Sequence, residues 1–189
     1  EPAGVNIGLV VGTDSALLID CGSSPVQGRA IAASAVERAG RPLSHVVITH
    51  DHWDHFWGLA GVVEVEPGVV SIAHESVVPQ TSDEAREQAS SLGFDLDELI
   101  APGNPMSLVK AFDLGGRRVE VLHLGPAHTQ GDSVVLVADA RVAFAGDVFE
   151  TAGPPSCGPE STIETWPAVL HSVLAGAQDD VIIVPGHGE

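Results

Sequence analysis

Short apolar stretches alternate with polar, glycine-containing turns along most of the chain, and this spacing predicts strands. Residues 6–12 and 15–20 are two such stretches, and the Gly12-Thr13-Asp14 sequence between them suits a hairpin turn. Further strands are predicted at residues 45–49, 69–73, 107–113, 117–122, 133–138, 141–144 and 181–184. Leu114-Gly115-Gly116 and Asp139-Ala140 are short enough to join the strands beside them as hairpins.

Three segments are predicted to be helical. Residues 25–39 carry apolar side chains near helical spacing, with Pro25 suited to the first turn and Gly40 to the end. Residues 82–92 begin with Ser82 as a cap and have acids in the first turn. A third helix is predicted at residues 162–176. Residues 93–106 look irregular and are a candidate lid or insertion.

The order of these elements predicts an α+β fold. Each half of the chain has strands, then a helix, then a short apolar strand that ends in histidine, which predicts two mixed β-sheets packed face to face with helices outside. With 189 residues, 44% of them hydrophobic, we expect one domain over residues 1–189. No apolar run approaches the ~18 residues of a membrane span.

The charge balance limits the partners. The chain has 8 Lys and Arg against 26 Asp and Glu, a formal net charge of −18, so its surface repels phosphate backbones and anionic lipids. We therefore expect a small-molecule substrate, and neither nucleic acid nor a membrane as partner. The two cysteines, Cys21 and Cys157, do not make a disulfide framework, which favours a cytoplasmic location.

A dense group of metal-binding side chain types follows the strand at residues 45–49. His50, His52, Asp54 and His55 form the pattern H-x-H-x-D-H. A strand fixes where its last residue points, and the turn after it can direct neighbouring side chains toward one spot. Imidazole and carboxylate are ligands that zinc prefers, so the pattern predicts a metal site.

Three more candidate ligands stand at strand ends in the second half of the chain. His128 lies between two apolar runs, Asp147 follows Phe144-Ala145-Gly146, and His187 follows the strand at residues 181–184. A glycine near each one allows a sharp turn of the backbone. Five histidines and two aspartates are too many for one tetrahedral ion, and they divide naturally between two ions with a carboxylate bridge.

On these motifs the chain resembles the metallo-β-lactamase-fold metallohydrolases, over about residues 6–187. The resemblance implies an αββα sandwich with the site along one edge of the two sheets. It implies two Zn²⁺ ions, with Fe or Mn as alternatives in one or both sites. The first ion would be held by His50, His52 and His128, the second by Asp54, His55 and His187, and Asp147 would bridge both.

The resemblance also implies a hydrolase in which the two metals share a hydroxide. Asp54 would be catalytic, orienting the hydroxide and passing its proton to the leaving group. Asp147 stands where the B1 and B2 β-lactamases carry Cys, so a dedicated β-lactamase of those classes is not expected. Glyoxalase II-like thioesterases carry an added C-terminal helical domain, whereas this sequence ends two residues after His187. The expected substrates are small esters, thioesters, lactones or amides, with promiscuous β-lactam hydrolysis as a side activity.

Two other functions stay open on sequence. Persulfide dioxygenases share this fold and bind one iron, through residues corresponding to His128, Asp147 and either His50 or His52; metal content and oxygen consumption separate them from hydrolases. A non-enzymatic, metal-stabilised binding domain is the third hypothesis, and the complete ligand set argues against it.

Several polar residues have a less specific interpretation. Asp20 resembles the family's buried carboxylate and would orient a ligand histidine, or it makes an Asx turn or helix cap. Asp51 is not expected to be a ligand, Cys157 lies in a loop that contacts substrate in some family members, and core packing is the better interpretation of Trp53 and Trp57. Structural or surface roles are expected for His45, His74, His123 and His171.

Overall fold

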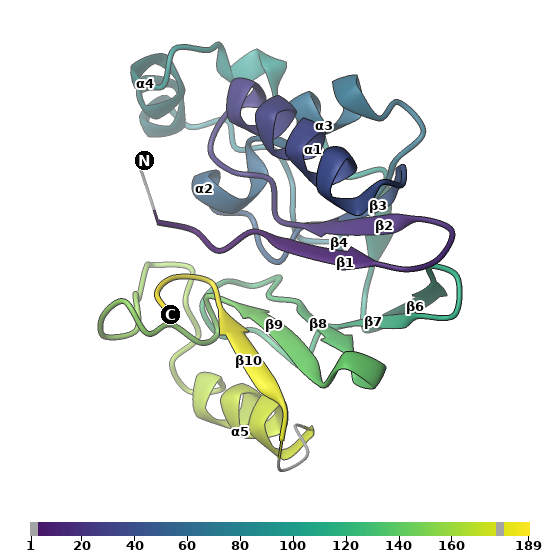
Figure 1. Cartoon of the computed structure of the whole chain (residues 1–189). Helices are drawn as coiled ribbons and strands as arrows, with labels where there is room; N and C mark the ends of the chain where they lie inside the picture. The colour runs from purple at the N-terminus through teal and green to yellow at the C-terminus, as the bar shows by residue number, and fades with distance from the viewer. Residues whose placement is uncertain (1–3, 177–179) are drawn as a thin grey trace.

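Two five-stranded sheets form the centre of the computed structural model, which describes residues 4–176 and 180–189 (Figure 1). The first sheet has the order β1 (Gly8–Val11), β2 (Ala16–Ile19), β3 (Leu43–Val47), β4 (Val70–His74) and β5 (Asn104–Met106). The second has the order β10 (Ile182–Pro185), β9 (Val142–Gly146), β8 (Val134–Val137), β7 (Arg118–Leu122) and β6 (Val109–Asp113).

The first sheet is mostly parallel. Strands β1 and β2 form an antiparallel hairpin, and β2, β3, β4 and β5 pair in parallel. Parallel neighbours need crossover connections, which here contain helices. Those helices are α1 (Pro25–Ala39), α2 (Trp53–Phe56), α3 (Leu59–Val65) and α4 (Asp83–Ser91), followed by the 3₁₀ turn η1 (Leu96–Glu98).

The second sheet is mostly antiparallel. Strands β6, β7, β8 and β9 follow one another in space as in sequence, and the short 3₁₀ turn η2 (Ala138–Ala140) joins β8 to β9. Strand β10 runs parallel to β9, and α5 (Trp166–Gly176) lies in the crossover between them. The ends of β9 and β10 therefore meet at the same edge of the sheet.

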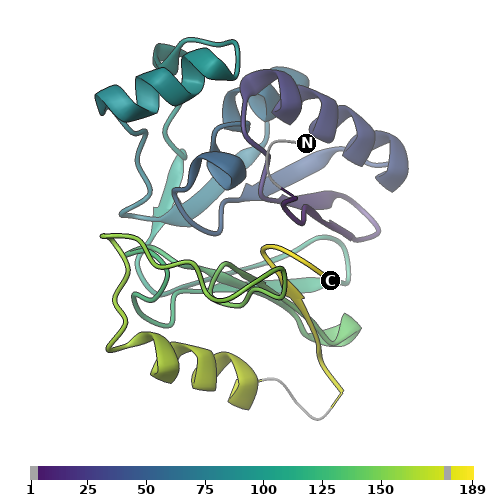
Figure 2. The same cartoon turned by 90° about the vertical axis from the view of Figure 1, so that its left-hand side faces the viewer.

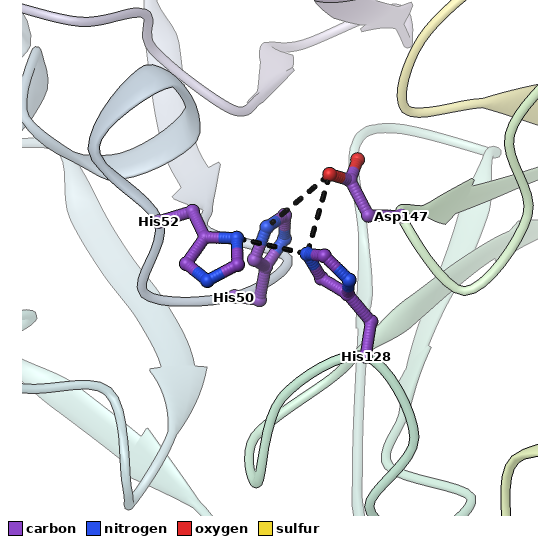
Figure 3. A group of neighbouring side chains, drawn as sticks. All are labelled: His50, His52, His128 and Asp147. Atoms are coloured by element: carbon purple, nitrogen blue, oxygen red, sulfur yellow. Dashed lines mark hydrogen bonds and ion pairs between the residues drawn. The ribbon is translucent and has the colours of Figure 1, made fainter. Parts of the chain in front are cut away.

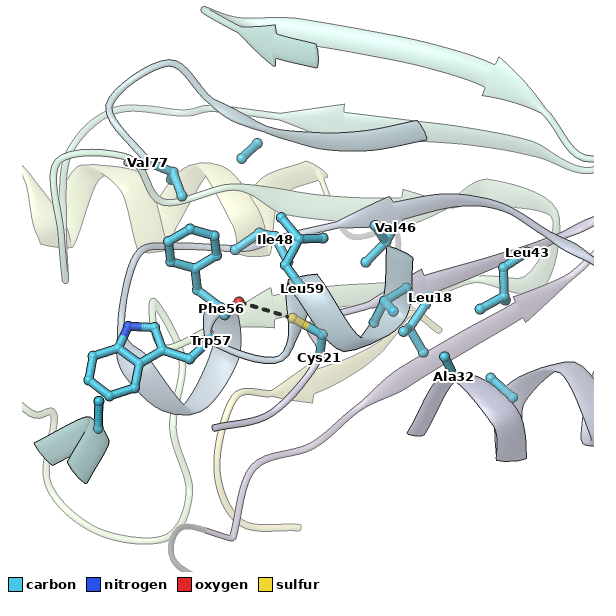
Figure 4. Packing of buried hydrophobic residues seen from close by; sticks show 14 of the residues in the cluster. Leu18, Cys21, Ala32, Leu43, Val46, Ile48, Phe56, Trp57, Leu59 and Val77 are labelled. Atoms are coloured by element: carbon cyan, nitrogen blue, oxygen red, sulfur yellow. Dashed lines mark hydrogen bonds between the residues drawn. The ribbon is translucent and has the colours of Figure 1, made fainter. Parts of the chain in front are cut away.

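Three apolar layers hold the sheets and helices together. Alternate residues of β2 face opposite sides: Leu18 packs toward the helices, whereas Leu17 and Ile19 pack between the sheets. Figure 4 shows the helix-side layer, and a third layer joins the second sheet to α5. The order of layers is helix, sheet, sheet, helix in both views of the chain, so the predicted αββα sandwich is confirmed (Figure 2).

Local signals placed several boundaries correctly. The hairpin between β1 and β2 is present, and Pro25 lies in the first turn of α1. Gly40 ends that helix in the left-handed region at φ 59°, where glycine is favoured. Ser82 caps α4, because its side chain accepts a hydrogen bond from the backbone N–H of Ala85.

Other boundaries differ from the prediction. Helices α2 and α3 were not predicted, because they are short and interrupted by glycine, and α5 begins at Trp166 after a turn at residues 163–165. The irregular segment at residues 93–106 is fixed to the core rather than being a free lid: Leu96 is buried in the helix-side layer and β5 pairs with β4. Within the described residues, none of the helices is long and apolar enough to cross a membrane.

Candidate metal centre

The seven predicted metal ligands come together at one edge of the sandwich, where strands of both sheets end. His50 and His52 follow β3, and α2 carries Asp54 and His55. From the second sheet, His128 comes from the connection between β7 and β8, Asp147 directly follows β9, and His187 follows β10. Both halves of the chain therefore contribute to one centre.

The first group contains His50, His52, His128 and Asp147, whose ligand atoms all lie within 4.8 Å of one another (Figure 3). His128 Nε2 is 2.8 Å from His52 Nδ1. Asp147 Oδ2 is 3.4 Å from His128 Nε2 and 3.7 Å from His50 Nε2. These three histidines and one carboxylate make a compact donor set of the kind that a divalent metal uses.

The second group contains Asp54, His55 and His187, whose ligand atoms also lie within 4.8 Å of one another. His187 Nε2 is 3.4 Å from Asp54 Oδ2 and 3.4 Å from Asp147 Oδ2. His55 Nε2 is 3.2 Å from Asp147 Oδ1. Asp147 thus contacts both groups, with one carboxylate between them.

Buried hydrogen bonds orient two of the histidines. Asp20 accepts hydrogen bonds from the backbone N–H of Thr49 at 2.8 Å, from the Thr49 hydroxyl at 2.9 Å and from His55 Nδ1 at 2.8 Å. Because the single hydroxyl proton of Thr49 goes to Asp20, its oxygen accepts the proton of His50 Nδ1, 3.0 Å away. In both histidines Nε2 is left free to face the centre. The role of Asp20 in orienting a histidine is therefore favoured over an Asx turn or cap.

The other two histidines of the first group are oriented by the loop between β9 and α5. His128 Nδ1 donates to the backbone carbonyl of Ser156 at 2.9 Å, which leaves Nε2 facing inward. His52 has the opposite arrangement, since its Nε2 contacts Glu160 Oε1 at 2.9 Å and its Nδ1 faces the centre. Ser156 and Glu160 were not predicted, because no sequence pattern connects residues 108 positions apart such as His52 and Glu160.

The fit of these residues to a metal rests on polar atoms that have no other partner. Among the described residues, His50 Nε2 and Asp147 Oδ1 are buried and make no hydrogen bond. An unsatisfied buried polar atom costs about 1–3 kcal/mol, so such atoms call for an explanation, and ion coordination provides one. Nitrogen and oxygen donors suit divalent metal ions, and in four of these histidines the ring nitrogen that points away from the centre is already hydrogen-bonded to the protein.

Burial and neighbouring charges set the protonation of the centre. Burial lowers the pKa of His50 well below its usual value, and the nearby His55 lowers it further. Burial also opposes charge on His55, but Asp20 and Asp147 outweigh it and raise that pKa well above its usual value. For Asp147, burial is outweighed by the adjacent imidazoles of His187 and His55, so its pKa lies well below the usual range. The carboxylate is ready to bind a cation, and His55 releases its proton when it does so.

Glu150 is a further carboxylate at the centre that the sequence analysis missed. One of its oxygens lies within 4.8 Å of ligand atoms of Asp147 and His187. Burial and the adjacent Asp147 raise its pKa. Glu150 Oε2 also accepts a hydrogen bond from the backbone N–H of Ser156 at 3.3 Å, which ties the loop to the centre.

The remaining residues singled out in the sequence belong to none of the donor groups that the described residues form. His45 stacks on Phe112, His74 stacks on His123, and Asp51 belongs to none of the donor groups formed by the described residues. Trp57 is buried in the helix-side core, as expected. The two cysteines are unpaired, with Cys21 buried and Cys157 exposed.

Comparison with known proteins identifies the family. The model of the metallo-beta-lactamase superfamily matches residues 1–187, so the chain belongs to that superfamily. The solved metallo-beta-lactamase from Pontibacter korlensis superposes with a TM-score of 0.76 at 21% identity, covering 98% of this chain and 80% of the other. At that identity the superposition establishes the shared fold.

Curated relatives include hydroxyacylglutathione hydrolases. GloC of Haemophilus influenzae is 28% identical over 81% of this chain and 72% of its own length. The enzyme of Ruegeria pomeroyi is 32% identical over 82% of this chain but only 52% of its own length, so this chain spans about half of that relative. These relatives return the glyoxalase II-like thioesterases to the candidate subfamilies. Together with the His and Asp donors, they support a metal-dependent hydrolase.

Proposed function

We propose that the chain is a zinc-dependent hydrolase with two metal ions at the sheet edge. The first ion would be held by His50, His52 and His128, the second by Asp54, His55 and His187, and Asp147 would bridge both. One observation carries this proposal: the carboxylate of Asp147 belongs to the first donor group and lies within 3.4 Å of His55 and His187 of the second, and four of the histidines have their outer nitrogen held so that the other faces the centre. Such pre-orientation lowers the cost of binding a metal.

The chain's own residues would supply binding, orientation and proton transfer. When bound, divalent ions provide a hydroxide at neutral pH and polarise the carbonyl that it attacks. Asp54 is the proposed proton carrier: its carboxylate lies 3.4 Å from His187, and the residue lines a small cavity of about 130 Å³. It would take the proton of the attacking water and deliver it to the oxygen, sulfur or nitrogen of the leaving group as the acyl bond breaks.

The proposed substrates are small esters, thioesters, lactones or amides, with β-lactam hydrolysis as a side activity. The relatives named hydroxyacylglutathione hydrolases support hydrolysis of an acyl group. An iron dioxygenase of the persulfide type would use only the first donor group. The dioxygenase hypothesis does not explain why Asp54, His55 and His187 lie together as a second donor group, and the hydrolase is therefore preferred.

Metal content and hydrolysis, measured on the same preparation, test this proposal. We expect about two zinc ions per chain by elemental analysis of protein purified without added metal, and turnover of at least one ester, thioester, lactone or amide that a strong chelator abolishes. One iron per chain, oxygen consumption with a persulfide and no hydrolysis would overturn it.

A matched pair of variants separates ligand loss from general damage to the loops. Asp147→Ala should lose at least one ion, since it removes the carboxylate of the first group that also contacts His55 and His187 of the second. Asp51→Ala removes an acid from the same motif that belongs to neither group, and should keep the metal content of the unmodified chain. Equal metal content in the two variants would contradict the proposed bridging role.

A further inference from the structure

An apolar cavity of about 390 Å³ lies between the segment after β9 and the N-terminal half of α5. Its aliphatic and aromatic walls include Val148, Phe149, Ile163, Trp166 and Leu170. Glu150 is the one charged side chain among its lining residues. A space of this size and lining suits a small apolar group better than an ion or a sugar.

The cavity shares its walls with the metal centre. Glu150 lines it and also lies within 4.8 Å of ligand atoms of Asp147 and His187. The ring of Trp166, another lining residue, is 5.7 Å from the ring of His128, centroid to centroid. Ser156, whose carbonyl holds His128, is flanked by the lining residues Pro155 and Cys157. A group in the cavity would therefore belong to a molecule that reaches the metals.

In the part of the chain that the structure describes, the acidic side chains around the centre have no Lys or Arg among the partners that they contact, because the cationic side chains of this chain lie elsewhere. Asp51 and Glu160 contribute further carboxylates beside His52, in addition to Glu150. Of the 8 cationic side chains in the sequence, five are held in ion pairs with carboxylates away from the centre: Arg29, Arg86, Arg117, Arg118 and Arg141. Arg38 and Arg41 bond to Ser34 and to the carbonyl of Gly12, and Lys110 lies on β6.

We propose that this cavity binds an uncharged, apolar substituent of the substrate and discriminates against substituents that end in a carboxylate. The inference rests on the proposed hydrolase and names its substrate class. Burial of apolar surface favours binding by roughly 25 cal/mol per Å², whereas a carboxylate in this apolar lining loses hydration and meets Glu150 as the one charged side chain.

Three matched esters test the specificity of the zinc-loaded protein. The 4-nitrophenyl esters of acetic, hexanoic and adipic acid compare a short acyl group, a longer apolar one and one of similar length with a terminal carboxylate. We expect kcat/KM to rise at least about tenfold from acetyl to hexanoyl and to fall at least about tenfold from hexanoyl to adipoyl. If kcat/KM does not depend on the acyl group but is higher for S-hexyl thioacetate than for S-methyl thioacetate, the cavity receives the leaving group instead of the acyl group.

A cation placed in the cavity wall should reverse the preference. Ile163 lines the cavity and is 62% exposed, so Ile163→Arg should be tolerated by the fold. Val26, 68% exposed on α1 in the opposite helix layer, provides the control Val26→Arg with the same added charge. We expect Ile163→Arg to lower kcat/KM for the hexanoyl ester and to raise it for the adipoyl ester, each at least about fivefold. For Val26→Arg, kcat/KM for each ester should stay within about twofold of the value for the unmodified protein.

Binding without turnover separates this inference from the proposed function. The neutral ketone 2-octanone should quench tryptophan fluorescence, because Trp166 lines the cavity, and 7-oxooctanoate should bind at least about tenfold more weakly. Selective ketone binding that Ile163→Arg weakens, in protein that hydrolyses nothing, would overturn the hydrolase and leave the cavity assignment standing. Hydrolysis that is indifferent to chain length and charge, with no ketone binding, would overturn the cavity assignment and leave the hydrolase standing.

Discussion

Two histidine–carboxylate pairs at the metal centre have nearly the same geometry and very different surroundings. His55 Nδ1 lies 2.8 Å from Asp20, and His52 Nε2 lies 2.9 Å from Glu160. The side chains of the first pair are 0% and 3% exposed, whereas those of the second are 26% and 39% exposed. The same hydrogen bond is therefore made once in the protein interior and once at its surface.

The two carboxylates also differ in what depends on them. Asp20 holds the backbone and hydroxyl of Thr49 as well as His55, and through Thr49 it reaches His50. Glu160 sits on a surface loop and receives His52 alone through its side chain among the described residues. An interior charge pair is weakly screened and an exposed one strongly screened. Removal of the Asp20 carboxylate should therefore lower the stability of the fold more than removal of the Glu160 carboxylate, whereas both removals should weaken metal binding.

Removal of the Asp20 carboxylate should have the largest effect. Asp20→Ala leaves the amide and hydroxyl of Thr49 and the Nδ1 of His55 without their buried partner, so we expect the free energy of unfolding to fall by about 3–5 kcal/mol. Urea unfolding, followed by circular dichroism on the metal-free proteins, measures it. A decrease in the free energy of unfolding below about 1 kcal/mol would show that water replaces the carboxylate. The buried pair would then contribute no more to stability than the exposed pair.

Asp20→Asn should separate orientation from packing. Asparagine keeps the volume and tolerates the φ of 61° at this position, so the fold should survive with a smaller loss of stability. Its amide can donate toward His55 Nδ1, which would place the ring proton on Nε2, the atom proposed to hold the second ion. We expect about one metal ion to be lost per chain, with the Nε2 proton visible by ¹⁵N NMR of the imidazoles; full metal content would contradict the orienting role of Asp20.

Removal of the Glu160 carboxylate should weaken metal binding with little effect on the fold. Because this pair is substantially exposed, we expect Glu160→Ala to change the free energy of unfolding by about 0–1 kcal/mol. Loss of a partner that holds a metal-ligating histidine typically costs about tenfold or more in affinity, which competition with a zinc chelator can measure. Glu160→Gln, which keeps a hydrogen-bond acceptor, should recover most of the affinity. Equal zinc affinity in the unmodified protein, Glu160→Ala and Glu160→Gln would show that Glu160 does not contribute to metal binding.

The smallest effect is expected at an ion pair far from any ligand. Arg86 and Asp97 lie 3.0 Å apart with side chains 48% and 77% exposed, so their attraction is screened by water and salt. Asp97→Asn should change the free energy of unfolding by no more than about 0.5 kcal/mol and leave the metal content unchanged. A larger change would mean that solvent exposure does not determine how much a charge pair contributes to stability in this protein. Exposure would then not account for the difference between the two histidine–carboxylate pairs.

Local sequence was sufficient where the determinants of a feature are close together in the chain. The β1–β2 hairpin, the caps at Ser82 and Gly40, and the H-x-H-x-D-H pattern each depend on neighbouring residues, whose geometry is set by backbone preferences and short-range hydrogen bonds. The layered αββα arrangement also followed from the order of strands and helices, because each apolar face must be buried against another.

Only the tertiary structure decided which distant groups meet. Whether Asp20 makes a local turn or orients His55 depends on how the segment after β2 packs against α2, and these two residues are 35 positions apart. The hydrogen bond of His52 with Glu160 joins opposite halves of the sandwich. The cavity beside His128 likewise exists only because α5 packs beneath the loop after β9. These contacts bring together side chains that share no sequence pattern, so the sequence by itself determined the donor chemistry, and folding decided what orients the donors and what lies beside them.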